Sequence, residues 1–132
     1  MTRLATRSEK LSNVLAWELA PETGFCRSMV TVTVEAGMDV GAVVVLNAGK
    51  YKWVAAADVA SLAGDVRIVI DPSVAGKAAG DATLAVLGSE AAFTPAQVNR
   101  KGLKFKDALS EAQIDAVVAK LNARGIRTKT RV

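Results

Sequence analysis

Residues 29–35, MVTVTVE, alternate apolar and polar side chains without a break. Val30, Val32 and Val34 fall on one side of this alternation, and threonines and a glutamate fall on the other. Successive side chains of a β-strand point to opposite faces, so the pattern predicts a strand with one buried face. Valine and threonine are β-branched and fit a pleated sheet better than a helix. The segment therefore predicts a core that is built on β-sheet.

Similar segments recur along the chain, separated by glycine, asparagine and aspartate residues that favour turns. In one of them, Tyr51 and Trp53 fall on one face of the expected strand, and Lys50 and Lys52 fall on the other. Residues 55–64, AAADVASLAG, fit either a short helix or a loop. The strands that we expect after the first one lie at 42–47, 50–54, 65–71, 82–88, 102–106 and 126–132.

One helix is predicted near the end of the chain, over about residues 110–124. Ser110 and Gln113 have the spacing of a capping box, in which each side chain binds the backbone N–H of the other residue. Gly125 is suited to the left-handed residue that ends a helix. The apolar stripe that would bury one face of this helix consists of Ile114, Val117, Val118 and Leu121.

Residues 1–27 lack such regular patterns. They mix charges with isolated large apolar side chains, and the APETG sequence at 20–24 ends any continuing helix. Leu11, Val14 and Leu15 have the spacing of a single helical turn, which is marginal without a surface to pack on. We therefore expect an extended N-terminal arm, 1–27, that needs a partner surface, followed by a β-rich core, 28–132.

The fold class that these patterns predict is α+β and mostly β. The core is expected to consist of short antiparallel strands with the one C-terminal helix, and to follow the extended N-terminal arm. A chain of 132 residues that is 51% hydrophobic is large enough for one domain with a real core.

The chain contains no histidine. Histidine is the commonest general acid or base near neutral pH, so Ser-His-Asp and Cys-His catalytic systems are excluded. Zinc sites of the H-E-x-x-H type are excluded for the same reason. Chemistry that uses carboxylates or lysine stays open, but we expect a protein that is not an enzyme and has no catalytic residues.

The sequence also gives no sign of a cofactor or metal site. The Gly-Lys pair in AGKAAGD lacks the leading glycine and the following serine or threonine of a phosphate-binding loop, and no G-x-G-x-x-G occurs. The carboxylates form no D-x-D-x-D calcium loop. The single cysteine rules out an intrachain disulfide and a cysteine-based zinc cluster. We expect neither cofactor nor metal.

That cysteine, Cys26, stands directly before Arg27. A neighbouring cation lowers the pKa of a thiol and is one way to make a nucleophile. The competing interpretation is that Cys26 is a small buried residue at the start of the first strand. We favour the structural interpretation, since no histidine is available as a base.

The charge balance is basic, with a net charge of +4 and a pI near 9.5. This permits contact with nucleic acid, but the cations are dispersed, carboxylates interrupt them, and no RNA-binding aromatic motif accompanies them. An acidic protein surface is an equally suitable partner. The apolar runs are shorter than the roughly 20 residues that cross a bilayer, and no secretion signal is apparent. We expect synthesis in the cytosol and no membrane partner.

Several segments, in their order, resemble the lambda-type head decoration proteins of tailed bacteriophages. The resemblance extends over about residues 13–127. The segments that carry it are VLAWE, FCRSMVTV, GAVVVLNAGKYKWV, GDATLAVLGSEAAF, VNRKGLKF and SEAQIDAVVAKLNARGI.

The resemblance implies a non-enzymatic protein of the virion that binds the outer surface of the expanded head. Such proteins stabilise the head by bridging subunits of the major capsid protein, commonly as homotrimers at three-fold and quasi-three-fold positions. The N-terminal arm would make the contact, because a segment without its own core suits the addition of a strand to a partner's sheet. A basic nucleic-acid-binding accessory protein is the alternative.

Candidate capsid contacts lie in the arm and at its junction with the core. Trp17 and Phe25 are expected to be the apolar anchors, since aromatic side chains contribute most at interface centres. Glu18 and Arg27 are expected to fix the orientation. The full set of expected contacts is Leu15, Trp17, Glu18, Phe25 and Arg27.

Overall fold

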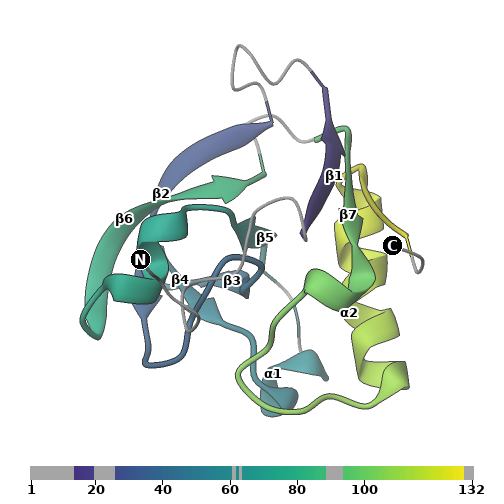
Figure 1. The fold of residues 1–132 in the computed structure, drawn as a ribbon. Helices are drawn as coiled ribbons and strands as arrows, with labels where there is room; N and C mark the ends of the chain where they lie inside the picture. Colours follow the sequence, from purple (N-terminus) through teal and green to yellow (C-terminus); the bar gives the residue numbers. More distant parts are fainter. Residues whose placement is uncertain (1–13, 20–25, 61, 63, 89–93, 130–132) are drawn as a thin grey trace, which may run out of the picture.

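A computed structural model describes residues 14–19, 26–60, 62, 64–88 and 94–129 of the chain. The predicted class is confirmed for these residues, which form a small, mostly β domain with one helix near the C-terminus. Figure 1 shows two parts lying side by side, a barrel on the left and a smaller sheet with the C-terminal helix on the right.

Five strands close into a barrel in the order β2-β4-β3-β5-β6. The longest pairing joins β2 and β6, which run antiparallel over eight residue pairs from Arg27↔Leu87 to Val34↔Gly80. The other side of β2 pairs with β4 in parallel, and this contact closes the barrel. The barrel strands are β2 (Arg27–Val34), β3 (Val43–Asn47), β4 (Lys50–Trp53), β5 (Val66–Val69) and β6 (Gly80–Leu87).

The apolar side chains of the alternating segments fill the interior of this barrel. Val32 and Val34 of β2 point inward and are almost fully buried, while Thr33 between them is half-buried and Thr31 before them is exposed. The predicted faces of β4 are confirmed, since Tyr51 and Trp53 are buried in the same interior cluster. The cluster is completed by Met38, Ala42, Val44, Val69, Val74, Leu84 and Val86.

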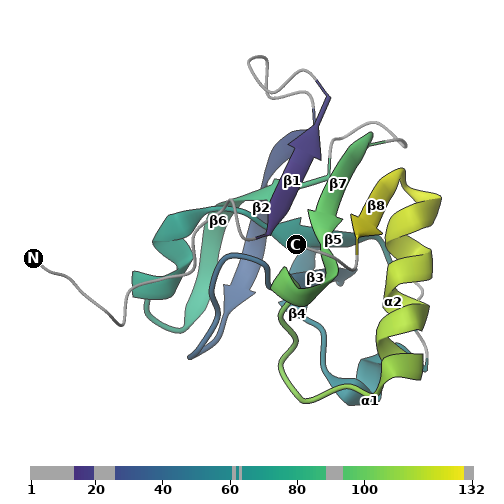
Figure 2. The same ribbon diagram turned by 45° about the vertical axis from the view of Figure 1, so that its right-hand side comes forward.

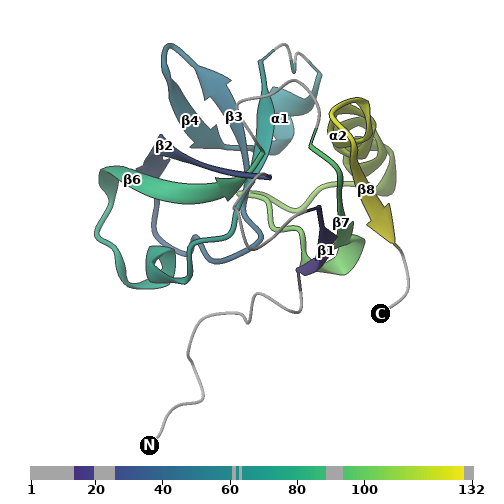
Figure 3. The same cartoon turned by 90° about the horizontal axis from the view of Figure 1, so that it is seen from above.

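The second sheet has the order β1-β7-β8. Its strands are β1 (Leu15–Glu18), β7 (Ala96–Asn99) and β8 (Ile126–Lys129). β1 pairs antiparallel with β7, and β8 pairs with β7 in parallel. The helix α2 (Glu111–Ala123) lies beside β8, as Figures 2 and 3 show.

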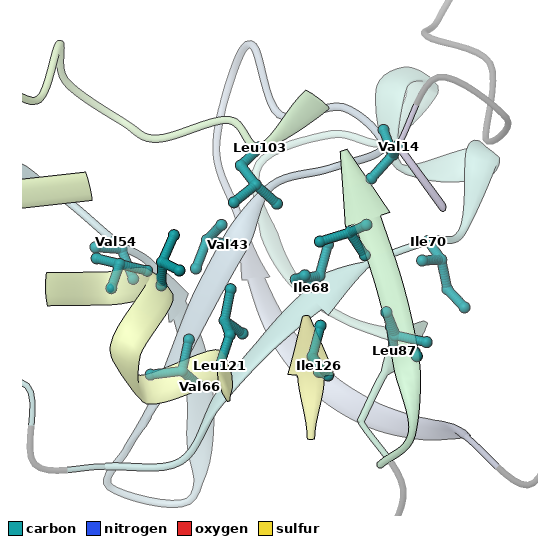
Figure 4. Packing of buried hydrophobic residues seen from close by; sticks show 14 of the residues in the cluster. Val14, Val43, Val54, Val66, Ile68, Ile70, Leu87, Leu103, Leu121 and Ile126 are labelled. Atoms are coloured by element: carbon teal, nitrogen blue, oxygen red, sulfur yellow. The ribbon is translucent and has the colours of Figure 1, made fainter. Parts of the chain in front are cut away.

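A second apolar cluster joins the barrel to this sheet and helix. It contains the outward-facing residues of β3 and β5, such as Val43 and Ile68, and the buried residues of α2 and β8, such as Leu121 and Ile126. Figure 4 shows these side chains meeting between the two parts. Because so much apolar surface is shared, the barrel and the smaller sheet form one core region rather than separate domains.

The ends of α2 agree with the sequence-based prediction. Ser110 Oγ accepts a hydrogen bond from the N–H of Gln113 at 3.2 Å, and Gln113 Oε1 accepts one from the N–H of Ser110 at 2.9 Å. Gly125 has φ 100°, and its N–H donates to the carbonyl of Asn122 at 2.9 Å. The buried stripe consists of Val117, Val118 and Leu121.

The strand expected at 102–106 is not formed. The segment instead begins in the 3-10 turn η4 (Arg100–Gly102) and then makes a single bridge between Lys104 and Ala42. Its alternation arises because Leu103 and Phe105 pack on the core while the Lys104 backbone bonds to neighbouring loops. The remaining short elements are α1 (Ala56–Val59), which resolves the helix-or-loop alternative, and η3 (Pro72–Gly76).

Two pairings differ from the expected all-antiparallel arrangement, since β2–β4 and β7–β8 are parallel. The N-terminal arm also differs where it is described. Val14 is fully buried in the shared core and β1 is hydrogen-bonded to β7, so residues 14–19 belong to the domain. The remainder of the expected arm, 1–13 and 20–25, lies outside the described residues.

Candidate protein interface at the β1 edge

Strand β1 presents the exposed aromatic side chain that the sequence suggested as an anchor. The pairing of β1 with β7 is irregular between Leu15 and Trp17. Leu15 packs against the shared core, whereas Trp17 faces outward and is 52% exposed. Leu19, directly after β1, is 43% exposed, and its N–H donates to the carbonyl of Pro95 at 3.0 Å. Exposed apolar groups therefore lie close together at this edge of the sheet.

Glu18 and Arg27 bind each other. Glu18 is only 6% exposed, and Arg27 Nε donates to both of its carboxylate oxygens at 3.1 Å. A third contact joins Arg27 Nη2 to Glu18 Oε1. The hydrogen bond to Glu18 raises the pKa of Arg27 further above its ordinary value. The pair connects the end of β1 to the start of β2, so Glu18 is part of the fold rather than an open contact group.

Cys26 is a buried packing residue. Its side chain is fully buried in the shared core, and Sγ donates to the carbonyls of Pro95 at 3.2 Å and Leu19 at 3.5 Å. Burial raises the pKa of the Cys26 thiol, and the neighbouring Arg27 does not offset this effect. The structure supports the structural interpretation, because a thiol with a raised pKa and no exposed surface is a poor nucleophile.

The structure brings four of the five expected contact residues together, but with different exposures. Trp17 is exposed, Leu15 and Arg27 are half-buried, and Glu18 is buried. Phe25 lies outside the described residues. The sequence did not reveal that two of these charged residues, Glu18 and Arg27, bind each other.

A surface hollow of about 330 Å³ lies beside Trp17. Gln97 is the register partner of Trp17 on β7, and Arg127 is the register partner of Gln97 on β8. These three side chains form a row across the sheet, and all three line the hollow together with Pro95, Ala96 and Gly125. Sequence reasoning missed Gln97 and Arg127, because only the pairing of β7 with both neighbours places them next to Trp17.

A second hollow, of about 420 Å³, lies between η4 and α2. Its apolar lining residues are Leu103, Phe105 and Ile114. Arg100 on its rim donates to Glu111 at 3.0 Å and to Asp115 at 2.8 Å. These ion pairs fix the start of α2 against η4, so the hollow lies within a contact that the fold itself uses.

Many of the cations are bound to carboxylates. Besides Arg27 and Arg100, ion pairs join Lys50 to Asp81 at 2.6 Å and Lys106 to Glu35 at 2.9 Å. Further pairs are Lys52–Asp58, Arg67–Asp65 and Arg124–Asp65. These cations are therefore already bound within the fold, and the net charge of +4 resides on the others.

Among the described residues, no group of three or more histidine, cysteine, aspartate or glutamate side chains is placed to hold a metal ion. In the same part of the chain, no helix has the length and apolar character to cross a membrane. Comparisons with protein-family models, with curated proteins and with solved structures find no match for this chain.

Proposed function

We propose that this protein is a capsid decoration protein of the lambda type, which binds the outside of an expanded phage head and bridges subunits of the major capsid protein. The order of its sequence segments is the basis for naming that family. The structural observation that supports the proposal is Trp17, which is 52% exposed on an edge strand of the smaller sheet. A large exposed aromatic side chain on a rigid strand is a suitable interface anchor.

The fold holds this anchor firmly in place. β1 is paired with β7, Val14 at its start is fully buried, and Glu18 at its end binds Arg27 of β2. A side chain presented by a rigid strand loses little conformational freedom on binding, which favours affinity. Residues 1–13 precede this strand in the sequence, and we propose that they contact the same partner as Trp17.

The mechanism of stabilisation is mass action. A protein that binds the assembled, expanded lattice and not its separate subunits shifts the equilibrium toward the lattice. Copies that bridge neighbouring subunits, arranged as homotrimers at three-fold positions, multiply a modest effect at each contact. This mechanism requires a binding surface and no catalytic reaction. It would place the protein on the outside of the virion.

The test is to mix the purified protein with expanded heads of a lambda-type phage that carries its gene, prepared without this protein, and to image the particles by electron cryomicroscopy. We expect added density at the three-fold and quasi-three-fold positions. Trp17→Ala should reduce occupancy strongly, while Met29→Ala, which truncates a side chain that is 61% exposed on the barrel, should not. Heads that gain no density with the wild-type protein would refute the proposal.

The contribution of the N-terminal residues is tested by a shorter deletion than the expected arm. Removal of residues 1–27 would take Val14 and Cys26 out of the core, where both are fully buried. Removal of residues 1–13 leaves β1 intact. We expect this variant to fold and to bind heads more weakly, and unchanged binding would show that the contact lies elsewhere.

A further inference from the structure

We propose that the outer face of the β1–β7–β8 sheet binds an acidic, extended protein segment, which places an apolar side chain in the hollow beside Trp17 and a carboxylate on Arg127. The inference rests on the proposed function for the identity of the partner as a capsid protein. The chemistry of the contact follows from the sheet itself.

The sheet has one face in the shared core and another face that is open in part. Ala96, Val98 and Ile126 point into the shared core and are at most 2% exposed. Of the residues that alternate with them, Gln97 is half-buried and Arg127 is exposed, whereas Asn99 at the end of β7 is 6% exposed. Figure 2 shows the three strands side by side, with α2 lying beside β8 rather than across this open face.

The hollow on this face has the size and lining of a subsite for one side chain. Its volume of about 330 Å³ is at the lower end of the range for ligand pockets, about 300–1,000 Å³. Its lining combines the small residues Ala96 and Gly125 and the ring of Pro95 with the larger side chains of Trp17 and Arg127. An apolar side chain that packs on the indole would therefore bring neighbouring groups of its own chain close to the guanidinium.

The charges on this face favour an acidic partner. Arg127 has no carboxylate partner among the described residues, and Lys129 follows it on the same face of β8. The only acidic side chain in the three strands is Glu18, which is buried and bound to Arg27. Nothing on these strands therefore neutralises the two cations, and an acidic segment complements them.

A protein segment fits this face better than a nucleic acid. Surfaces that bind single strands combine a basic groove with several aromatic side chains, on which successive bases stack. Among the residues that the structure describes, Trp17 is the one aromatic side chain that lines the hollow. Tyr51 and Trp53 are buried in the barrel. A single exposed tryptophan beside an arginine suits a partner segment in which one apolar residue is flanked by carboxylates.

The experiment measures fluorescence anisotropy of labelled peptides with the full-length protein. The probe is an extended peptide of aspartate and glutamate residues around a single leucine, and the control peptide carries asparagine and glutamine in place of the acids. We expect binding of the acidic peptide that weakens as salt is raised, and at least about fivefold weaker binding of the control.

Single substitutions test whether the peptide binds at this sheet. Trp17→Ala should weaken binding of the acidic peptide about tenfold. Arg127→Gln should weaken it about two- to fivefold, and Arg127→Lys should restore part of the loss. The matched controls are Met29→Ala, another exposed apolar side chain, and Lys120→Gln, an exposed cation on α2. Both should bind as the wild type does.

The outcomes separate this inference from the proposed function. If heads bind the protein but Trp17→Ala and Arg127→Gln leave both head and peptide binding unchanged, the inference is overturned while the proposed function stands. If the acidic peptide binds at this face and heads do not, the proposed function fails and the chemistry of the contact stands. Binding of a single-stranded oligonucleotide in place of the acidic peptide would overturn the assignment to a protein segment.

Discussion

Asp65 accepts two hydrogen bonds from Arg124, from Nε and from Nη2, each at 3.1 Å, although 59 positions separate the two residues. The same carboxylate accepts from Arg67 Nε at 2.7 Å and from the Tyr51 hydroxyl at 3.0 Å. Arg67 in turn lies over the Tyr51 ring, 5.3 Å from its centroid. One carboxylate thus joins strands β4 and β5 to the residue that follows α2.

Replacing this carboxylate should destabilise the whole domain. Asp65→Asn removes the negative charge that binds the guanidinium groups of Arg67 and Arg124, whose side chains are 8% and 10% exposed. We expect the free energy of unfolding to fall by at least about 2 kcal/mol, measured by urea denaturation. Asp115→Asn, at a side chain that is 69% exposed, is the control and should cost less than about 1 kcal/mol. Equal losses of unfolding free energy in the two variants would contradict the role of Asp65 in joining β4 and β5 to Arg124.

The same cluster makes the stability of the fold depend on pH in the alkaline range. Burial and the hydrogen bond to Asp65 raise the pKa of Tyr51 from 10.0 to about 12. The fold favours the neutral phenol of Tyr51. Its contribution to the free energy of unfolding is therefore complete below the pKa that tyrosine has in the unfolded chain, and it is lost as the pH rises from about 10 to 12. Tyr51 is the only tyrosine, so ultraviolet absorbance of the phenolate reports its titration alone. We expect a midpoint near 12, and Tyr51→Phe should lose less stability over this range. A midpoint near 10 would contradict the prediction.

Gly41 is a position where the backbone leaves no room for a side chain. It has φ +100°, and a Cβ there would lie 2.2 Å from the carbonyl oxygen of Gly102. Gly41→Ala should therefore lower the free energy of unfolding by more than about 2 kcal/mol. Gly76→Ala, where a Cβ would meet nothing within 4 Å, should change it by less than about 0.5 kcal/mol. Thermal denaturation of both variants tests the difference, and a stable Gly41→Ala protein would disprove the close approach.

The β3–β4 hairpin contains a residue that its turn does not suit. Ala48 and Gly49 both have positive φ, 55° and 84°, between the paired residues Asn47 and Lys50. A two-residue turn of this kind prefers asparagine followed by glycine, because asparagine tolerates the left-handed conformation better than alanine. Ala48→Asn should stabilise the protein by about 0.5 kcal/mol or more, measured as a higher melting temperature. A lower melting temperature would contradict this reading of the turn.

The sequence predicted the parts of the fold that local patterns determine. The alternation of β2 and β4 identified both strands and the faces that fill the barrel, and the capping residues of α2 placed its ends. β7 was missed because the four residues AQVN carry no clear alternation. The parallel pairings were missed because they join strands that are distant in sequence, and no local pattern specifies the partner of a strand.

The candidate interface likewise combines a feature that the local sequence predicted with features that depend on strand pairing. Trp17 was singled out as a large apolar residue in an irregular segment, and it is exposed. The row from Trp17 through Gln97 to Arg127 depends on two registers, between β1 and β7 and between β7 and β8. The Asp65 cluster likewise depends on contacts between residues that are far apart in the chain. Such juxtapositions become visible only when the strands are paired.

The Glu18–Arg27 pair gives the clearest test of which residues at this edge belong to the fold and which to the partner. The Glu18 side chain is 4% exposed and binds Arg27, whose side chain is 35% exposed. Glu18→Gln removes the charge that Arg27 binds, so we expect the free energy of unfolding to fall by about 1–3 kcal/mol in urea denaturation. Glu111→Gln, at a side chain that is 85% exposed, should cost less than about 0.5 kcal/mol. Trp17→Ala should show the opposite behaviour, with nearly unchanged stability and weaker partner binding. If Glu18→Gln keeps its stability and loses only partner binding, Glu18 acts as a direct contact and its pairing with Arg27 is not what holds β1 to β2.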